Sequence, residues 1–208
     1  MSNSETSSQT VVLERFGLIR NLVNKIEDIE GDVVELGVMW GASLAVIAGA
    51  TRKPVWGFDN WKRDHPAEWE AERDLTTTTN FRFTQKAPLI YEKARNQGVV
   101  NPEEQIQLID GLVEDTLPTW EVDKVAFVHV DVDLYSGYKV AMETLWPKLS
   151  KGGIFLLDEY HRTEQYEQEH FRTTRLGAIA AVDEYLATLS KDSYTFNEYF
   201  RWWLQKNA

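Results

Sequence analysis

The stretch from Val125 to Gly137, VAFVHVDVDLYSG, most constrains the fold of this chain. Five of its first six residues are apolar, which predicts a strand buried on both faces, as in a parallel sheet. Asp131 and Asp133 follow at its end. Because side chains at i and i+2 of an extended segment point to the same side, we expect both carboxylates to share a face with the deeper His129. They repel each other unless a cation lies between them, although a strand-end or helix-capping role is the alternative for either one.

The bulk composition is that of one ordinary globular domain. The chain has 208 residues, of which 43% are hydrophobic, enough to form a substantial core. Its formal net charge of −11 argues against nucleic acid or an anionic membrane as a partner and is compatible with a bound cation. The lack of cysteine excludes disulfides and thiolate metal sites and fits the cytoplasm. No apolar run approaches the roughly 20 residues of a membrane span.

The N-terminal segment divides into a polar tail and an amphipathic helix. Residues 1–9 lack the basic and apolar regions of a signal peptide, and we expect them to be disordered. A helix over residues 10–30, with Thr10 as N-cap and Gly31 as stop, is predicted by apolar residues at helical spacing: Val12, Phe16, Ile19, Val23 and Ile26. This helix would cover a sheet edge or a bound ligand, or form the contact surface of a homo-oligomer.

A glycine loop follows the first predicted strand. Residues 32–37, DVVELG, end in Glu35 and Gly37, and a helix then opens with Gly41, Ala42 and Ser43. A strand, a glycine turn and a helix are typical of a nucleotide-type site, because glycine lets the backbone approach the ligand closely. The spacing differs from the GxGxxG of dinucleotide enzymes, and the acid before the glycine suits a ligand with an amino group and no phosphate. A structural tight turn is the alternative.

The second predicted strand, residues 54–59, also ends in an acid. Asp59 lies roughly 20 residues beyond the glycine loop, where a carboxylate can accept hydrogen bonds from both ribose hydroxyls. A helix N-cap is the other interpretation. Residues 60–100 then form a long connection with mixed charge and many aromatic residues, which we interpret as a lid or substrate insertion.

Two further predicted strands end in acidic residues. Residues 106–109 are followed by Asp110 and Gly111, and residues 152–157 by Asp158 and Glu159. Strands that alternate with helices predict one α/β domain over residues 10–208, with a parallel sheet covered on both faces and a final hairpin at its edge. Ligands of such sheets bind beyond the carboxyl ends of the strands. The acids would crowd that edge, which must hold a cation or ligand donors.

The ordered motifs resemble the macrocin O-methyltransferase family: VELGVMWGAS, GFDNW, DGLVEDTLP, HVDVDLYSGYKVAMETLWPKLSKGGIFLLDEY and AAVDEY. Members of this family use S-adenosylmethionine to methylate sugar hydroxyls in macrolide and aminocoumarin antibiotics. The resemblance runs from about residue 31 to the C-terminus and is weakest over residues 60–100. It implies the class I methyltransferase fold, a Rossmann-like α/β sheet of seven mostly parallel strands with an antiparallel last strand and helices on both faces.

The resemblance also implies roles for the cofactor-binding residues. Glu35, Gly37 and Ser43 would border the methionine part of S-adenosylmethionine, beside the loop glycine Gly41. Asp59 would hold the ribose. The adenine would lie near three consecutive residues after the third strand: Asp110, Gly111 and Leu112.

A metal site is implied at Asp131, Asp158 and Glu159, with Asp133 as general base. Glu159 departs from the family pattern, which has a second aspartate there, so its part in metal binding is open. His161 directly follows this acid pair and is a rival base. His129 lies inside the buried strand, and we interpret it as a packed, hydrogen-bonded residue.

Methyl transfer to an aliphatic hydroxyl accounts for such residues. A divalent cation lowers the pKa of an oxygen bound to it and can chelate two neighbouring oxygens of a sugar or another vicinal diol. Coordination by carboxylates alone favours a hard ion, Mg²⁺ first, and a free carboxylate can then take the proton. The implied partner is therefore a small sugar or glycoside acceptor.

Two other activities remain open from the sequence. A glycosyltransferase could use Asp131-Val132-Asp133 as a DxD motif for a metal and a nucleotide sugar, but the glycine loop and Asp59 would then have no role. A catechol-type methyltransferase would use similar metal chemistry on a phenol, and the aromatic-rich residues 60–100 could line either kind of pocket.

Overall fold

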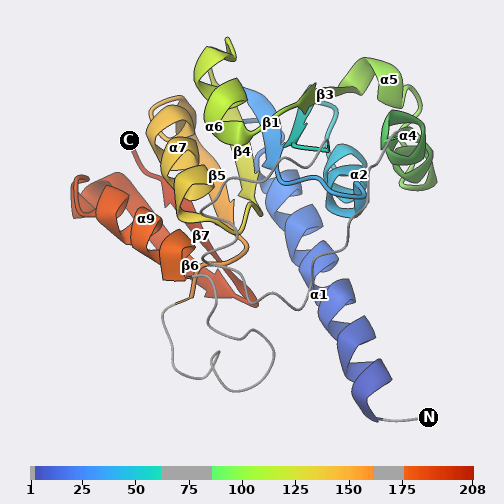
Figure 1. The fold of residues 1–208 in the computed structure, drawn as a ribbon, viewed down its shortest axis with the longest axis horizontal. Helices are drawn as coiled ribbons and strands as arrows, with labels where there is room; N and C mark the ends of the chain where they lie inside the picture. The colour runs from blue at the N-terminus through green and yellow to red at the C-terminus, as the bar shows by residue number, and fades with distance from the viewer. Residues whose placement is uncertain (1–2, 62–85, 162–175) are drawn as a thin grey trace.

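A seven-stranded sheet forms the centre of the protein, as a computed structural model that describes residues 3–61, 86–161 and 176–208 shows (Figure 1). Within these residues the strand order is β3-β2-β1-β4-β5-β7-β6. The strands are β1 (Asp32–Leu36), β2 (Val55–Asp59), β3 (Ile106–Asp110), β4 (Val125–Val130), β5 (Leu149–Leu157), β6 (Tyr194–Tyr199) and β7 (Arg201–Lys206).

The strand directions confirm the predicted sheet. The first five strands pair in parallel, β3 with β2, β2 with β1, β1 with β4 and β4 with β5. The last strand, β7, runs antiparallel to both β5 and β6. It inserts between them, so that β6 and not β7 forms the edge. Because the order reverses between β1 and β4, the carboxyl ends of these two strands flank the switch point at which ligands of open α/β sheets bind.

Helices cover both faces of the sheet (Figure 1). One face carries α1, α2 and α4, and the other carries α6, α7 and α9. The helical elements are α1 (Asn3–Lys25), α2 (Ala42–Ala48), α4 (Lys86–Asn96), α5 (Pro102–Gln105), α6 (Val113–Thr116), α7 (Tyr135–Leu145) and α9 (Leu176–Leu186), with short 3-10 turns η2 (Leu117–Thr119) and η3 (Lys191–Ser193). None of these described helices has both the length and the apolar character needed to cross a bilayer.

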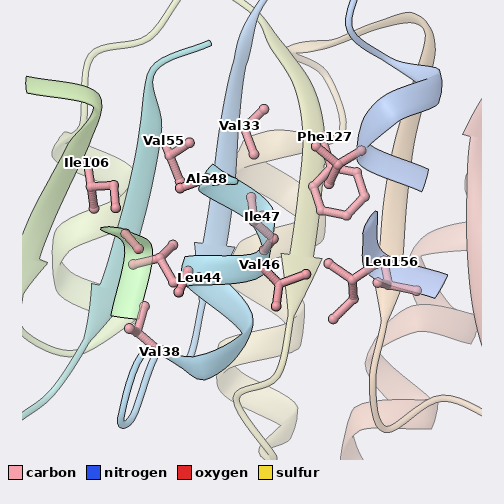
Figure 2. Packing of buried hydrophobic residues seen from close by; sticks show 14 of the residues in the cluster. Val33, Val38, Leu44, Val46, Ile47, Ala48, Val55, Ile106, Phe127 and Leu156 are labelled. Atoms are coloured by element: carbon pink, nitrogen blue, oxygen red, sulfur yellow. The ribbon is translucent and has the colours of Figure 1, made fainter. Parts of the chain in front are cut away.

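Alternation along each strand divides the core between the two faces. Figure 2 shows Val33, Phe127 and Leu156 on the face that α2 covers with Leu44 and Ile47. The neighbouring residues of the same strands belong to the second core layer, under α7 and α9: Val34, Val128 and Phe155. Continuous apolar strands therefore fill two layers at once, which is why the sequence reads as uninterrupted hydrophobic runs.

The N-terminal helix is longer than predicted. It begins at Asn3, within the polar residues 1–9 for which the sequence predicted a tail. No glycine or proline interrupts the polar residues before Thr10, and extending a helix that is already formed costs little. The helix ends at Lys25, earlier than the predicted residue 30. Its N-terminal half projects from the body of the protein, whereas its C-terminal half is buried through Leu18, Ile19, Leu22 and Val23 (Figure 1).

The structure describes residues 60–61 and 86–100 of the predicted insertion at residues 60–100. Residues 62–85, which include most of the expected lid, lie outside the described residues. The helix that follows, α4, buries Ile90 and Ala94 in the core beside α2. This part of the insertion is therefore a covering layer of the domain.

The turn after β1 brings the ends of β1 and β4 into contact at Gly37. Its N–H donates to the Phe58 carbonyl at 2.9 Å, and Asp131 N–H donates to the Leu36 carbonyl at 2.9 Å. Gly37 has a φ of +88°, and a Cβ built there would lie 1.8 Å from the Asp131 carbonyl oxygen. Only glycine leaves room for this backbone contact. The predicted glycine loop therefore has a structural cause in addition to any ligand.

Replacing Gly37 with alanine should lower the free energy of unfolding by about 3 kcal/mol or more, because strain at positive φ adds to a backbone clash. Gly98→Ala is the matched control, since its φ is also positive, at +93°, but no atom lies within 4 Å of the added Cβ. Gly98→Ala should lower the free energy of unfolding by only about 1 kcal/mol. Urea denaturation of both variants measures the difference. Equal losses would show that the contact with Asp131 imposes no constraint.

Candidate functional site

The acidic residues lie at the carboxyl edge of the sheet, on two different faces. Val33, Phe127 and Leu156 face α2 (Figure 2), and two residues further along each strand the same face carries Glu35, His129 and Asp158. Glu159 is the next residue after Asp158, so its side chain points to the opposite face, where it contacts Tyr138 of α7. The predicted acid pair 158–159 is therefore divided between the two sides of the sheet.

Glu35 and His129 form a fully buried pair. They are register partners on β1 and β4, both have 0% exposure, and His129 Nδ1 lies 2.8 Å from Glu35 Oε1. This confirms the interpretation of His129 as a packed, hydrogen-bonded residue. The second oxygen of Glu35 is buried and has no partner among the described residues. A buried carboxylate oxygen without a donor is costly, so this atom is a candidate to receive a ligand N–H.

His129 carries a positive charge in this environment. Burial lowers its pKa, but the hydrogen bonds and charges of Asp158 and Glu35 outweigh burial and raise the pKa of His129 to about 9. Its Nε2 lies 3.5 Å from Asp158 Oδ1, within ion-pair distance. An imidazolium at neutral pH has no free lone pair. The two carboxylates therefore favour the protonated form of His129 over a role as general base.

Two arginines from different elements contact Asp158. Arg15 Nε of α1 lies 3.1 Å from its Oδ1, and Arg201 Nε of β7 lies 3.2 Å from the same atom. Burial raises the pKa of Asp158, but His129, Arg15 and Arg201 together hold it well below its usual range. Asp158 is thus an ionised group surrounded by three cations.

Arg15 also binds Asp131, so that one guanidinium joins the ends of β4 and β5. Burial lowers the pKa of Arg15, and the attraction of Asp158 and Asp131 outweighs this and raises it. Sequence reasoning required a cation here and missed this one. The signal was present, because Arg15 precedes Leu18 and Ile19 by three and four residues and so belongs to the buried side of α1.

The predicted metal set of Asp131, Asp158 and Glu159 is divided between two groups of possible ligands and stays a prediction. Asp131, Asp133 and Glu159 offer oxygens that all lie within 4.8 Å of one another, whereas Asp158 is grouped with Asp131 and His129. Asp158 also contacts Arg15 and Arg201 and lies 3.5 Å from His129. The three carboxylates of the first group are hard oxygen donors of the kind that Mg²⁺ prefers, so these residues fit such an ion.

Glu159 is held in place by a tyrosine that the sequence did not reveal. Tyr138 Oη lies 2.5 Å from Glu159 Oε2 and accepts a hydrogen bond from Glu159 N–H at 3.1 Å. Burial and the charge of Glu159 raise the pKa of Tyr138 well above its ordinary value, so the hydroxyl keeps its proton. The longer side chain at position 159 is therefore anchored at the edge. Asp133 follows β4 with a φ of +68°, a conformation that aspartate tolerates better than most residues.

The predicted cofactor residues lie on the strand ends next to these acids. Asp59 Oδ2 accepts a hydrogen bond from Met39 N–H of the glycine loop at 2.5 Å. Its register partner on β3 is Asp110, which forms an ion pair with Lys86 at 2.7 Å. The remaining predicted residues border the same edge, with Gly41 at the N-cap of α2 (φ +73°), Ser43 buried in its first turn, and Gly111 and Leu112 after β3.

His161, the predicted rival base, is half-buried at the end of the described segment, two residues after Glu159. Lys86 is another residue that sequence reasoning missed. Besides Asp110, its ammonium contacts the Trp61 ring, 4.0 Å from the ring centroid. Lys86 thus connects α4 to the ends of β2 and β3.

Curated relatives of the chain are O-methyltransferases. It is 29% identical over 166 residues to 8-demethyl-8-(2,3-dimethoxy-alpha-L-rhamnosyl)-tetracenomycin-C 4'-O-methyltransferase of Streptomyces olivaceus, covering 76% of this chain and 64% of that protein. It is 26% identical over 160 residues to demethyldecarbamoylnovobiocin O-methyltransferase of Streptomyces niveus, covering 71% and 60%. The chain therefore spans less than two thirds of the length of either relative.

Solved methyltransferases share the fold. The calicheamicin methyltransferase CalS11 superposes with a TM-score of 0.69 at 20% identity, over 93% of this chain and 79% of that one. TomG of Streptomyces achromogenes, solved in complex with S-adenosylmethionine, gives 0.61 at 12% identity, over 94% and 80%. The model of the macrocin-O-methyltransferase (TylF) family matches residues 7–185, most of the chain. The chain belongs to the macrocin O-methyltransferase family.

Proposed function

We propose that this protein is an S-adenosylmethionine-dependent O-methyltransferase that methylates a hydroxyl of a sugar. Membership of the family and the class I methyltransferase fold support the activity, and a relative whose name contains a rhamnosyl group supports a sugar acceptor. The observation that carries the proposal is that the glycine loop, Asp59 and the carboxylates 131, 133 and 159 meet at one sheet edge. A glycosyltransferase would leave the first two of these without a role.

The cofactor would lie along the ends of β1, β2 and β3. Gly37 keeps the backbone open where the chain turns toward α2, and Asp59 offers a carboxylate for the ribose hydroxyls. The unpartnered oxygen of Glu35 is available to the amino group of the methionine part. S-Adenosylmethionine would supply the methyl group, which needs only an in-line approach by an oxygen nucleophile.

The carboxylates would activate the acceptor hydroxyl for attack on the methyl group. Asp131 and Glu159 would hold Mg²⁺, which commonly binds through one or two carboxylates plus water and substrate oxygens and would acidify the bound hydroxyl. Asp133 lies beside both and would receive the proton. Tyr138 keeps Glu159 oriented, and Arg15 contacts Oδ2 of Asp131.

Replacing Asp59 with asparagine should weaken binding of S-adenosylhomocysteine by about tenfold or more, because a carboxylate that accepts two ribose hydrogen bonds is lost. Asp115→Asn, an exposed position in α6, is the matched control and should bind as the wild type does. Isothermal titration calorimetry measures both. Absence of binding to the wild-type protein would refute the proposed function itself.

Replacing Asp133 with asparagine should lower methyl transfer by about 10²-fold or more while S-adenosylhomocysteine affinity changes little, because only the proton acceptor is removed. Release of S-adenosylhomocysteine with a panel of rhamnosyl glycosides is the readout. His161→Gln is tested beside it. Loss of turnover in that variant alone would assign the proton to His161 instead.

Removing divalent cations with EDTA should abolish turnover and leave cofactor affinity unchanged, since Asp59 and the glycine loop do not belong to the carboxylate group. Addition of Mg²⁺ should restore the rate. Turnover that persists in EDTA would show that no metal takes part.

A further inference from the structure

Arg15 holds the position at which a positive charge is most needed. Its Nη2 contacts Asp131 Oδ2 and its Nε contacts Asp158 Oδ1, so the guanidinium bridges two neighbouring strand ends. Asp131 is also one of the three carboxylates suited to a divalent ion. One carboxylate is therefore shared between an arginine of α1 and the proposed metal site.

Asp131 and Asp158 already have cationic partners without a metal. Arg15 contacts both carboxylates, and Arg201 contacts Asp158 as well. A divalent ion bound to Asp131 would add two positive charges next to the guanidinium. Two positive charges that contact the same carboxylate repel each other strongly where water is scarce. Arg15 and a bound metal therefore oppose each other.

Asp158 does not depend on Arg15 alone. Arg201, with a side chain only 5% exposed, and His129 still contact it if Arg15 withdraws. The Arg15 side chain is 25% exposed and so has a route to water. Withdrawal would leave Asp158 with Arg201 and His129, which reduces the usual penalty for breaking such a pair.

Arg15 also lies at the point where α1 leaves the surface of the domain. Leu18 and Ile19 are buried, whereas Leu13 is 72% exposed. Among the helix side chains described from Leu13 onward, the fully buried apolar ones therefore lie on the C-terminal side of Arg15. Detachment of this turn would leave Leu18 and Ile19 buried and would cost only the partly buried contact of Phe16.

We propose that Arg15 and a divalent cation compete for Asp131, so that metal binding releases the Arg15 turn of α1 from the acidic edge. The proposal rests on the metal site of the proposed function. It makes Arg15 a residue that sets metal affinity: it neutralises the carboxylates in the metal-free protein and gives way when the ion binds.

Calorimetric titration of Mn²⁺ into the full chain tests the competition. Arg15→Gln should bind Mn²⁺ about tenfold more tightly or better than the wild type, because a repelling charge next to Asp131 is removed. Arg15→Lys, which keeps the charge, should remain near wild type. Arg20→Gln is the matched control on the same helix, where Arg20 donates to Gln97 at 2.7 Å and not to an acid. Unchanged or weaker Mn²⁺ binding by Arg15→Gln would overturn the proposal.

Amide hydrogen exchange of the unmutated protein gives a second readout that does not depend on any variant folding. Mn²⁺ should accelerate exchange in residues 13–17 and leave residues 18–25 protected. Equal exchange with and without the ion would overturn the release of α1. S-Adenosylhomocysteine binding, measured on every sample, separates the two proposals: its presence alongside unchanged Mn²⁺ affinity refutes only the competition.

Discussion

The ionised carboxylate of Asp158 is the group on which the acidic edge depends. It lies almost buried at the end of β5, where an uncompensated charge would cost several kcal/mol. Arg15 arrives from α1, Arg201 from β7 and His129 from β4, so three separate elements converge on one side chain. The N-terminal helix, the last strand and the central strand therefore all contact the same charged group.

This neutralisation separates the acids of the edge into two groups. Glu35 and Asp158 belong to an internal network with His129, which gains a proton because both of its nitrogens face carboxylates. Asp133 and Glu159 lie outside that network and form the group that can take a metal, with Asp131 shared between the two. A row of acids that looks uniform in the sequence thus divides by the charge of its neighbours.

The two faces of the sheet explain how adjacent residues acquire different partners. Asp158 points to the side of α1 and α2, and Glu159 points to α7, where Tyr138 holds it. The extra methylene of glutamate, the departure from the family pattern, is accommodated by this tyrosine. Direct succession in the chain therefore does not give residues 158 and 159 the same protein partners.

The sequence by itself determined the α/β class, the antiparallel last strand and the acids at the strand ends. Apolar runs, glycine turns and alternating strands and helices are local patterns, so these features follow from short stretches such as residues 32–43 and 125–137. Burial of His129 was also predictable, because it stands inside an apolar strand.

Only the tertiary structure decided which cation meets which acid. Arg15 and Asp131 are 116 residues apart, and Arg201 and Asp158 are 43 apart. Such pairs leave no periodic signal in the chain, because they exist only once α1 docks on one face and β7 inserts beside β5. The required positive charge was evident from the sequence, but its source was not: electrostatic compensation depends on distance in space, which the folded sheet alone sets.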